Sequence, residues 1–195
     1  AFHVDAVQAW GKIPLRPRAW SVDLMSLSGH KIHGPKGSGA LYVRRGLELA
    51  PLLGGGEQER GLRPGTENVP GIAGLGEAAR LILEVGEAAA AEMRILRDRL
   101  RVRLAAIAEA TVNTPADGAA PHILNVSFAG VRGETLLHRL EMDGIYTSTG
   151  SACHSHDPTP SHVLLAIGLA PEMARSSVRF SLSRAAGANQ VQNGI

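Results

Sequence analysis

The chain has 195 residues, 44% of them hydrophobic and 19% charged, so it can form one ordinary domain, or a small domain plus part of a larger one. The formal net charge is only +2, the basic residues are dispersed and aromatic residues make up 4%, which argues against nucleic acid or an anionic membrane as partner. No apolar run approaches the roughly 18 residues of a membrane span, and the first residues do not resemble a signal peptide. A single cysteine excludes an internal disulfide and predicts a reducing, cytoplasmic location.

Three short apolar stretches near the start are expected to be β-strands: residues 2–5, 22–27 and 39–43. The first looks like a buried strand that ends in an acid, as in a parallel sheet covered on both faces. Residues 28–38, between the second and third strands, are rich in glycine and contain a proline, so they are expected to hold no regular structure.

A long helix is predicted for the middle of the chain. Asn68 followed by Pro70 is a helix start signal, and residues 72–109 are rich in Ala, Leu, Glu and Arg with apolar residues at helical spacing. Further on, alternation predicts strands at residues 123–128 and 177–182.

The predicted elements indicate an α/β fold, with a further helix at residues 133–142 between the last two strands. We expect three parts: residues 1–71 as the C-terminal part of a large domain, 72–110 as a connecting helix, and 111–195 as a small α/β domain.

Lys31 lies on the loop between two predicted strands, where a lysine can hold an aldehyde cofactor as a Schiff base. Alone it would more often be a solvated surface residue. Asp5 strengthens the case, because an acid ending an apolar strand needs a cationic partner such as a protonated pyridine nitrogen. Gln8 can hydrogen-bond the ring's phenolic oxygen, and Ser28 and His30 offer donors for a phosphate.

Two motifs closely resemble the NifS/IscS-type cysteine desulfurases, in the class V aminotransferase-like family: Val4-Asp5-Ala6-x-Gln8 and Ser28-Gly29-His30-Lys31-x-x-Gly34-Pro35-Lys36-Gly37-x-Gly39. The resemblance implies fold type I of the enzymes that depend on pyridoxal 5'-phosphate, with a partial, mostly parallel large domain. It also implies that Lys31 binds this cofactor covalently, Asp5 pairs with its pyridine nitrogen and Gln8 meets its phenolic oxygen. Ser28 and His30 would bind its phosphate.

The match continues in Glu59-Arg60-Gly61-Leu62-Arg63-x-Gly65-Thr66. In the family this threonine reaches the phosphate of the other subunit's cofactor, so the resemblance implies that Thr66 binds cofactor in a homodimer. The alternative is a simple turn with a capping threonine.

Cys153 is surrounded by Ser, Thr, Gly and His, which predicts a hydrated loop from which a nucleophilic thiolate can reach a substrate. The alternative is a buried, inert cysteine. A metal site is not expected, because His154, His156 and His162 lack a second cysteine and the paired spacing of zinc ligands.

Gly150-Ser151-Ala152-Cys153 resembles the sulfur-accepting segment of desulfurases with a long cysteine loop, and residues 125–128 and 176–182 are also family-like. By this resemblance Arg179 would clamp the substrate carboxylate, for which a planar, bidentate donor is well suited. Otherwise Arg179 would be an outward-facing residue on an alternating strand.

The function implied is conversion of L-cysteine to L-alanine, with Lys31 removing the α-proton and Cys153 carrying the sulfur as a persulfide. The sulfur would pass to an acceptor protein, such as a scaffold for iron–sulfur cluster assembly. Rival hypotheses are another class V enzyme, either an aminotransferase or a selenocysteine lyase, and a non-catalytic dimerisation or scaffold-binding module.

The resemblance runs from residue 2 to about residue 184. Family members carry a preceding half of the large domain, with a glycine-rich helix start, a histidine stacked on the ring and an asparagine near the substrate. They also continue with a helix where residues 185–195 are short and polar. We therefore expect a fragment with little or no desulfurase activity alone.

Overall fold

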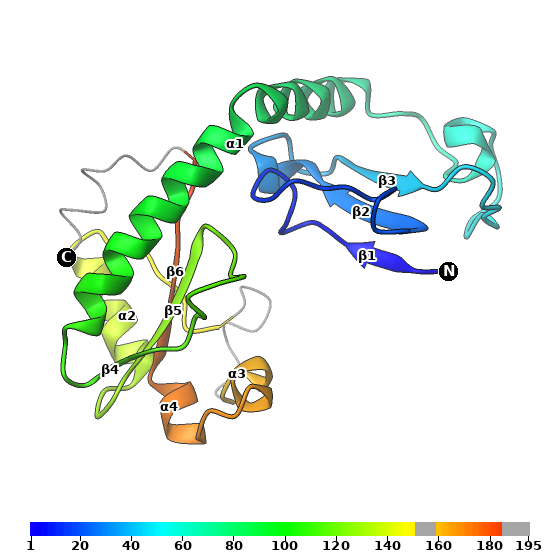
Figure 1. Ribbon diagram of the computed structural model, residues 1–195. Coiled ribbons are helices and arrows are strands. Elements are labelled where there is room, and N and C mark those ends of the chain that lie inside the picture. The colour runs from blue at the N-terminus through cyan, green and yellow to red at the C-terminus, as the bar shows by residue number, and fades with distance from the viewer. Residues whose placement is uncertain (151–158, 185–195) are drawn as a thin grey trace. The chain divides into compact units, whose positions relative to one another are not determined.

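The computed structural model describes residues 1–150 and 159–184. The chain folds as two compact units, Ala1–Glu87 and Ala88–Ile195, each containing a three-stranded sheet (Figure 1). The helix α1 (Val69–Ala105) contributes residues to both units. Its bounds differ by a few residues from the predicted connecting helix, and the division of the chain into large and small domains stays a prediction.

The first unit contains a mixed sheet in the order β1 (His3–Asp5), β2 (Leu24–Ser28) and β3 (Gly39–Val43). Strands β1 and β2 are parallel, whereas β2 and β3 are antiparallel. The α/β class is confirmed, but this sheet is not the mostly parallel one that was expected. Residues 29–38, which connect β2 to β3, are fewer than the dozen or so that a parallel crossover requires.

Within residues 1–150 and 159–184, β1 lies at the edge of this sheet, since it pairs there with β2 alone. The expectation of a fully buried first strand was wrong: His3 and Asp5 are exposed and Val4 is half-buried. The difference arises because burial of a parallel strand depends on elements that cover it, which a local apolar pattern does not specify.

A short 3-10 helix, η1 (Gly29–Ile32), interrupts the segment that was expected to be irregular. It ends at His33, whose φ of 67° lies in the left-handed region and whose amide donates to the carbonyl of Gly29. A second 3-10 turn, η2 (Gln58–Gly61), lies in the segment before α1.

Two buried clusters stabilise the first unit. One includes Met25 of β2, the strand that leads into η1, and the other includes Ile32, the residue next to Lys31. Their buried members are Ala6, Val22 and Met25 in the first, and Ile32, Leu75 and Ala78 in the second. In the second cluster, Ile32 of η1 packs against Leu75 and Ala78 of α1. Full burial of an aliphatic side chain such as Ile32 contributes about 1.5–3 kcal/mol, enough to hold the adjacent Lys31 in a defined place.

The second unit is built on an antiparallel sheet in the order β4 (Ala110–Val112), β5 (Ile123–Phe128) and β6 (Ser177–Ser181). The later part of α1 packs on one face of this sheet (Figure 1), where a buried cluster comprises Leu100, Leu104, Leu124 and Val126. The helices are α2 (Gly133–Met142), α3 (His162–Ala166) and α4 (Pro171–Arg175).

The bounds predicted for β5 and α2 are confirmed, and β6 ends one residue before its predicted end. The sequence did not predict β4, α3 or α4. These elements have 3, 5 and 5 residues, which is too few for a hydrophobic period to be recognised.

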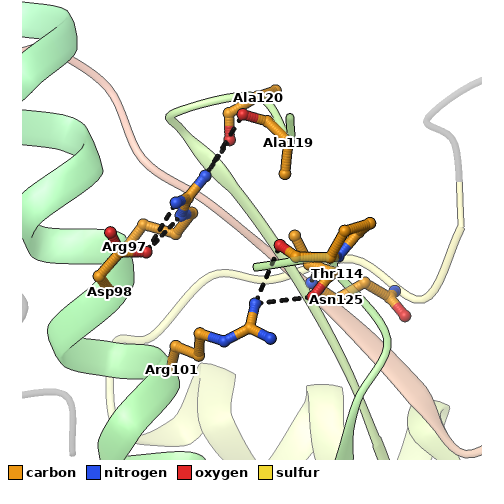
Figure 2. A network of polar contacts seen from close by, with 8 residues as sticks. Arg97, Asp98, Arg101, Thr114, Ala119, Ala120 and Asn125 are labelled. Carbon is orange, nitrogen blue, oxygen red and sulfur yellow. Dashed lines mark hydrogen bonds and ion pairs between the residues drawn. The ribbon is translucent and has the colours of Figure 1, made fainter. Parts of the chain in front are cut away.

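The connection between β4 and β5 is tied to α1 by two arginines (Figure 2). Arg97 is 1% exposed; its guanidinium donates to the carbonyl of Ala120 at 2.8 Å and pairs with Asp98 at 2.7 Å. Arg101 donates to the carbonyl of Thr114 at 2.7 Å. Carbonyls that a strand connection would otherwise leave unpaired near the core are thereby satisfied.

No helix within residues 1–150 or 159–184 is long and apolar enough to cross a membrane.

Candidate functional site

The lysine turn lies at one edge of the first unit's sheet. Asp5 is the last residue of β1 and Ser28 the last residue of β2, and Lys31 follows within η1. Because β1 and β2 are parallel, their carboxyl ends lie at the same edge, where α/β proteins commonly bind ligands. The fold therefore places Asp5 at the same edge as Ser28 and Lys31, which come much later in the sequence.

Ser28 and His30 form a hydrogen-bonded pair in this turn, with 2.8 Å between the Ser28 hydroxyl and His30 Nδ1. The His30 side chain is exposed and Ser28 is half-buried. Whichever of the two groups donates within this pair, the other keeps an O–H or N–H that it can donate to an oxygen of a phosphate group.

The amino group of Lys31 has no hydrogen-bond or ion-pair partner in the described part of the chain, although the residue is half-buried. Its neighbour Ile32 is fully buried, so the backbone at Lys31 is held while its side chain remains available. An unpaired, anchored amine is suited to attack an aldehyde.

Two glycines of the lysine motif are required by close packing. A Cβ on Gly29 would lie 2.7 Å from the Ser38 hydroxyl, and a Cβ on Gly34 would lie 3.0 Å from the carbonyl of Gly29. A third glycine, Gly74 of α1, approaches Pro35, since its Cβ would lie 2.6 Å from Pro35 Cγ. A side chain at position 74 would displace the Pro35 ring, whereas one at position 34 would need a small shift of the Gly29 carbonyl and one at position 29 a movement of the Ser38 hydroxyl. Gly74 could not be singled out from the sequence, because its role depends on a tertiary contact.

Asp5 accepts a hydrogen bond from the amide of Val7 at 2.9 Å through one carboxylate oxygen. Its exposure leaves the carboxylate accessible to a cationic ring nitrogen. Gln8 and Thr66 are exposed, and neither side chain is hydrogen-bonded to another residue that the structure describes. Among the described residues, no hydrogen bond or ion pair joins these two side chains to the lysine turn.

A cavity of about 360 Å³ lies in the second unit. Side chains from β5 and β6, the start of α2, and α3 line it, together with chain on both sides of residues 151–158. Its polar and charged lining includes Asn125, Arg132, Glu134, Thr149, His162, Arg175 and Arg179. Arg132 and Glu134 pair with 3.3 Å between their charged groups, so Arg175 and Arg179 give the cavity an excess of positive charge.

Arg179 is half-buried, and its Nε is buried without a hydrogen-bond partner among the residues that the structure describes. Leaving such a donor unpaired costs roughly 1–3 kcal/mol. The positive charge of its guanidinium also favours an anion bound in the cavity that Arg179 lines. The backbone of Arg179 pairs with Ser148, donating to its carbonyl at 2.6 Å. This pairing places the backbone of Arg179 beside Ser148, which precedes the segment that contains Cys153.

Cys153, His154 and His156 lie outside the described residues. The chain on either side of their segment lines the cavity, at Thr149 and Gly150 before it and at Thr159 and Pro160 after it. The expected carboxylate clamp and both ends of the cysteine segment therefore border one cavity. Among the residues that the structure describes, no three His, Cys, Asp or Glu side chains could together hold a metal ion.

Residues 1–193 match the model of the family described as aminotransferase class-V. The chain belongs to this family. Its members depend on pyridoxal phosphate, which fits the donors, carboxylate and free amine of the lysine turn.

Known relatives agree with this assignment. A protein named cysteine desulfurase from Trichormus azollae is 53% identical over 184 residues, covering 94% of this chain and 46% of that relative. A solved NifS-like protein superimposes with a TM-score of 0.88 at 41% identity, over 98% of this chain and 49% of its own. A solved structure described as SspA in complex with cysteine gives a TM-score of 0.68 at 38% identity, over 93% of this chain and 50% of its own. This chain thus spans about half the length of the curated relatives that it matches.

The cavity also contains residues that the sequence analysis gave no role. Asn125 was noted only as part of a family-like strand, and the contribution of Thr149 and His162 to one lining was not foreseen. The polar members of alternating strands β5 and β6 were the available signal, because they must share one face of the sheet.

Proposed function

We propose that this chain carries the cofactor lysine, the substrate-carboxylate site and the sulfur-accepting cysteine of a cysteine desulfurase. The observation that carries the proposal is the cavity of the second unit. Arg179 lines it, with its Nε buried and without a hydrogen-bond partner among the described residues, and both ends of the Cys153 segment border it. A site that binds an amino-acid carboxylate beside a nucleophilic thiol is what sulfur removal from L-cysteine requires.

The lysine turn supplies the groups that would hold pyridoxal 5'-phosphate. Lys31 offers its amine to the aldehyde carbon, and Ser28 and His30 donate to the phosphate. Asp5 would pair with the pyridine nitrogen, and Gln8 would hydrogen-bond the phenolic oxygen. When bound, the cofactor supplies an electron sink that acidifies the α-proton of the substrate.

Three residues of the protein then have separate roles in the reaction. Arg179 orients the substrate through its carboxylate, and the Lys31 amine takes the α-proton as a general base. The Cys153 thiolate forms a sulfur–sulfur bond with the substrate sulfur as the substrate's carbon–sulfur bond breaks. The β-carbon takes up a proton and the Lys31 ammonium returns one to the α-carbon, so the products are L-alanine and a persulfide on Cys153.

The exposure of Thr66 supports a homodimer, in which Thr66 reaches the cofactor phosphate of the second copy. The persulfide would pass to a sulfur-acceptor protein such as an iron–sulfur scaffold. A cytoplasmic location stays a prediction from the single cysteine.

The test is the absorbance spectrum of the purified protein after addition of pyridoxal phosphate, compared with Lys31→Ala. We expect a band near the edge of the visible range that is lost in Lys31→Ala, because only an amine bonded to the aldehyde extends the conjugated system. Lys36→Ala is the matched control, since Lys36 is an exposed lysine of the same loop. Equal bands in wild type and Lys31→Ala would refute the role of Lys31. Absence of a band in wild type would show that these residues do not assemble a cofactor site in this chain.

A further inference from the structure

A chain of hydrogen bonds runs across the face of the second sheet that lies opposite α1. The Ser127 hydroxyl donates to the carbonyl of Met173 at 2.8 Å. The side-chain nitrogen of Asn113 donates to the Ser127 oxygen at 2.8 Å and to the side-chain oxygen of Asn125 at 2.7 Å. Asn125 in turn lines the cavity and is the register partner of Arg179.

The donors and acceptors in this series of hydrogen bonds determine the orientation of each side-chain amide. The carbonyl of Met173 can only accept, so the single hydrogen of the Ser127 hydroxyl is committed to it. The Ser127 oxygen must then accept from Asn113, and the atom of Asn113 that faces it must be the NH2 group. The same NH2 faces Asn125, which therefore presents its carbonyl oxygen to Asn113.

The NH2 group of Asn125 is therefore the part of its side chain that can donate a hydrogen bond to a ligand in the cavity. The backbone of Asn125 is also held, because its amide donates to the Thr114 hydroxyl at 2.7 Å and Arg101 binds the Thr114 carbonyl (Figure 2). Amide side chains can usually turn end for end, but here the reversed orientation would place two donors against each other.

We propose that Asn125 is a specificity-determining residue, whose NH2 group donates to the same substrate carboxylate that Arg179 binds. Asn113 is the positioning residue that keeps this group turned toward the ligand. This inference rests on the proposed function, in which Arg179 receives that carboxylate. Directly opposed residues of an antiparallel pair have Cβ atoms about 4.5–5.5 Å apart, so both side chains can reach the two oxygens of one carboxylate.

The experiment is a titration of the full ¹⁵N-labelled chain, without cofactor, followed by NMR. The ligand is L-alanine, the proposed product, and the comparison ligand is ethylamine, which lacks the carboxylate. We expect the side-chain NH2 signals of Asn125, identified by their loss in Asn125→Ala, to shift with L-alanine and not with ethylamine. A merely structural role for Asn125 would not give this selectivity.

Asn125→Ala should weaken L-alanine binding about tenfold, the effect of one hydrogen bond to a charged group. Asn113→Asp should weaken it by a similar factor, since an acceptor opposite Asn125 draws the NH2 group away from the cavity. Ala116→Asp adds the same charge at an exposed position of the neighbouring loop, and we expect it to leave the affinity within about twofold of wild type.

Wild-type affinity in Asn125→Ala together with weakened binding in Arg179→Lys would overturn the role of Asn125 and leave that of Arg179 standing. Wild-type shifts that are equal for L-alanine and ethylamine, or absent for both, would overturn both carboxylate contacts. The Lys31 band would be unaffected by that result, so the cofactor site is judged separately. If circular dichroism shows that Asn113→Asp does not fold, Asn125→Ala alone decides.

Discussion

At the scale of single residues, Lys31 and Arg179 share an uncommon property. Lys31 has no hydrogen-bond or ion-pair partner in the described part of the chain, and the buried Nε of Arg179 has none either. Most buried polar groups in proteins are paired, so the Nε of Arg179, a residue that lines the cavity, is an exception among the described residues. Under the proposed function, Lys31 would meet the cofactor aldehyde and Arg179 the substrate carboxylate.

When the preceding half of the large domain found in family members is supplied, because this chain alone is expected to form little or no alanine, Cys153→Ser should abolish alanine formation from L-cysteine. The Lys31-dependent absorbance band should stay intact. The hydroxyl of serine does not accept sulfur, whereas the cofactor groups are unchanged. The measurement is alanine released per mole of protein with excess L-cysteine. Sustained alanine production by Cys153→Ser would favour a different class V enzyme, because a transaminase does not need this thiol.

Asp23 provides a pH prediction. A hydrogen bond from the Phe2 amide at 2.7 Å, reinforced by one from Arg44, lowers the pKa of Asp23 below its ordinary value of 3.8. The carboxylate therefore stabilises the fold above that ordinary value, and the contribution is lost as the pH falls through the lower, folded pKa. Melting temperatures of wild type and Asp23→Asn should differ above pH 3.8 and converge as the pH falls below the lowered pKa of Asp23. A constant difference would contradict the assignment.

At the scale of elements, the connection between β4 and β5 depends on α1. Arg97 and Arg101 hold this loop from the helix, and the loop in turn holds Asn125 through Thr114 (Figure 2). A helix that forms part of the core thereby also determines the geometry of one wall of the cavity.

Arg97→Ala should lower the free energy of unfolding by about 2–4 kcal/mol, because it empties a buried volume and leaves the carbonyl of Ala120 without its donor. Arg94, one turn earlier, is exposed, and Arg94→Ala should change the same quantity by less than about 0.5 kcal/mol. Urea unfolding followed by far-ultraviolet circular dichroism gives both values. Equal midpoints for the two variants would show that the arginine–carbonyl contacts contribute little.

At the scale of the whole molecule, large apolar side chains remain exposed in the first unit around the segment that contains Thr66. Leu52 is 94% exposed, Leu53 65% and Val69 66%. Exposed apolar residues that gather in one segment are commonly covered by a partner. This agrees with the proposal that Thr66 reaches a second copy of the chain.

Leu52→Asp combined with Leu53→Asp should weaken self-association by at least about tenfold, since a charge at a desolvated contact costs more than about 1.4 kcal/mol. Analytical ultracentrifugation over a range of concentrations gives the dissociation constant. Met142→Asp, at an exposed apolar residue of the second unit, is the matched control. A wild-type protein that stays monomeric throughout would contradict the homodimer.

The sequence by itself determined the elements whose pattern is local and long enough to be recognised. The alternation of β5, the period of α2 and the glycine-rich lysine motif each follow from residues close together in the chain. Helix α1 was also anticipated within a few residues. Its Ala-, Leu- and Glu-rich composition favours helix whatever it packs against.

Tertiary structure decided the rest. The mixed sheet, the exposure of Asp5 and the closeness of Gly74 to Pro35 depend on which distant segments meet. The unpaired Nε of Arg179 and the orientation of Asn125 depend on partners drawn from several elements of the second unit. Burial and hydrogen-bond pairing are properties of groups brought together across the chain, so a local pattern cannot specify them.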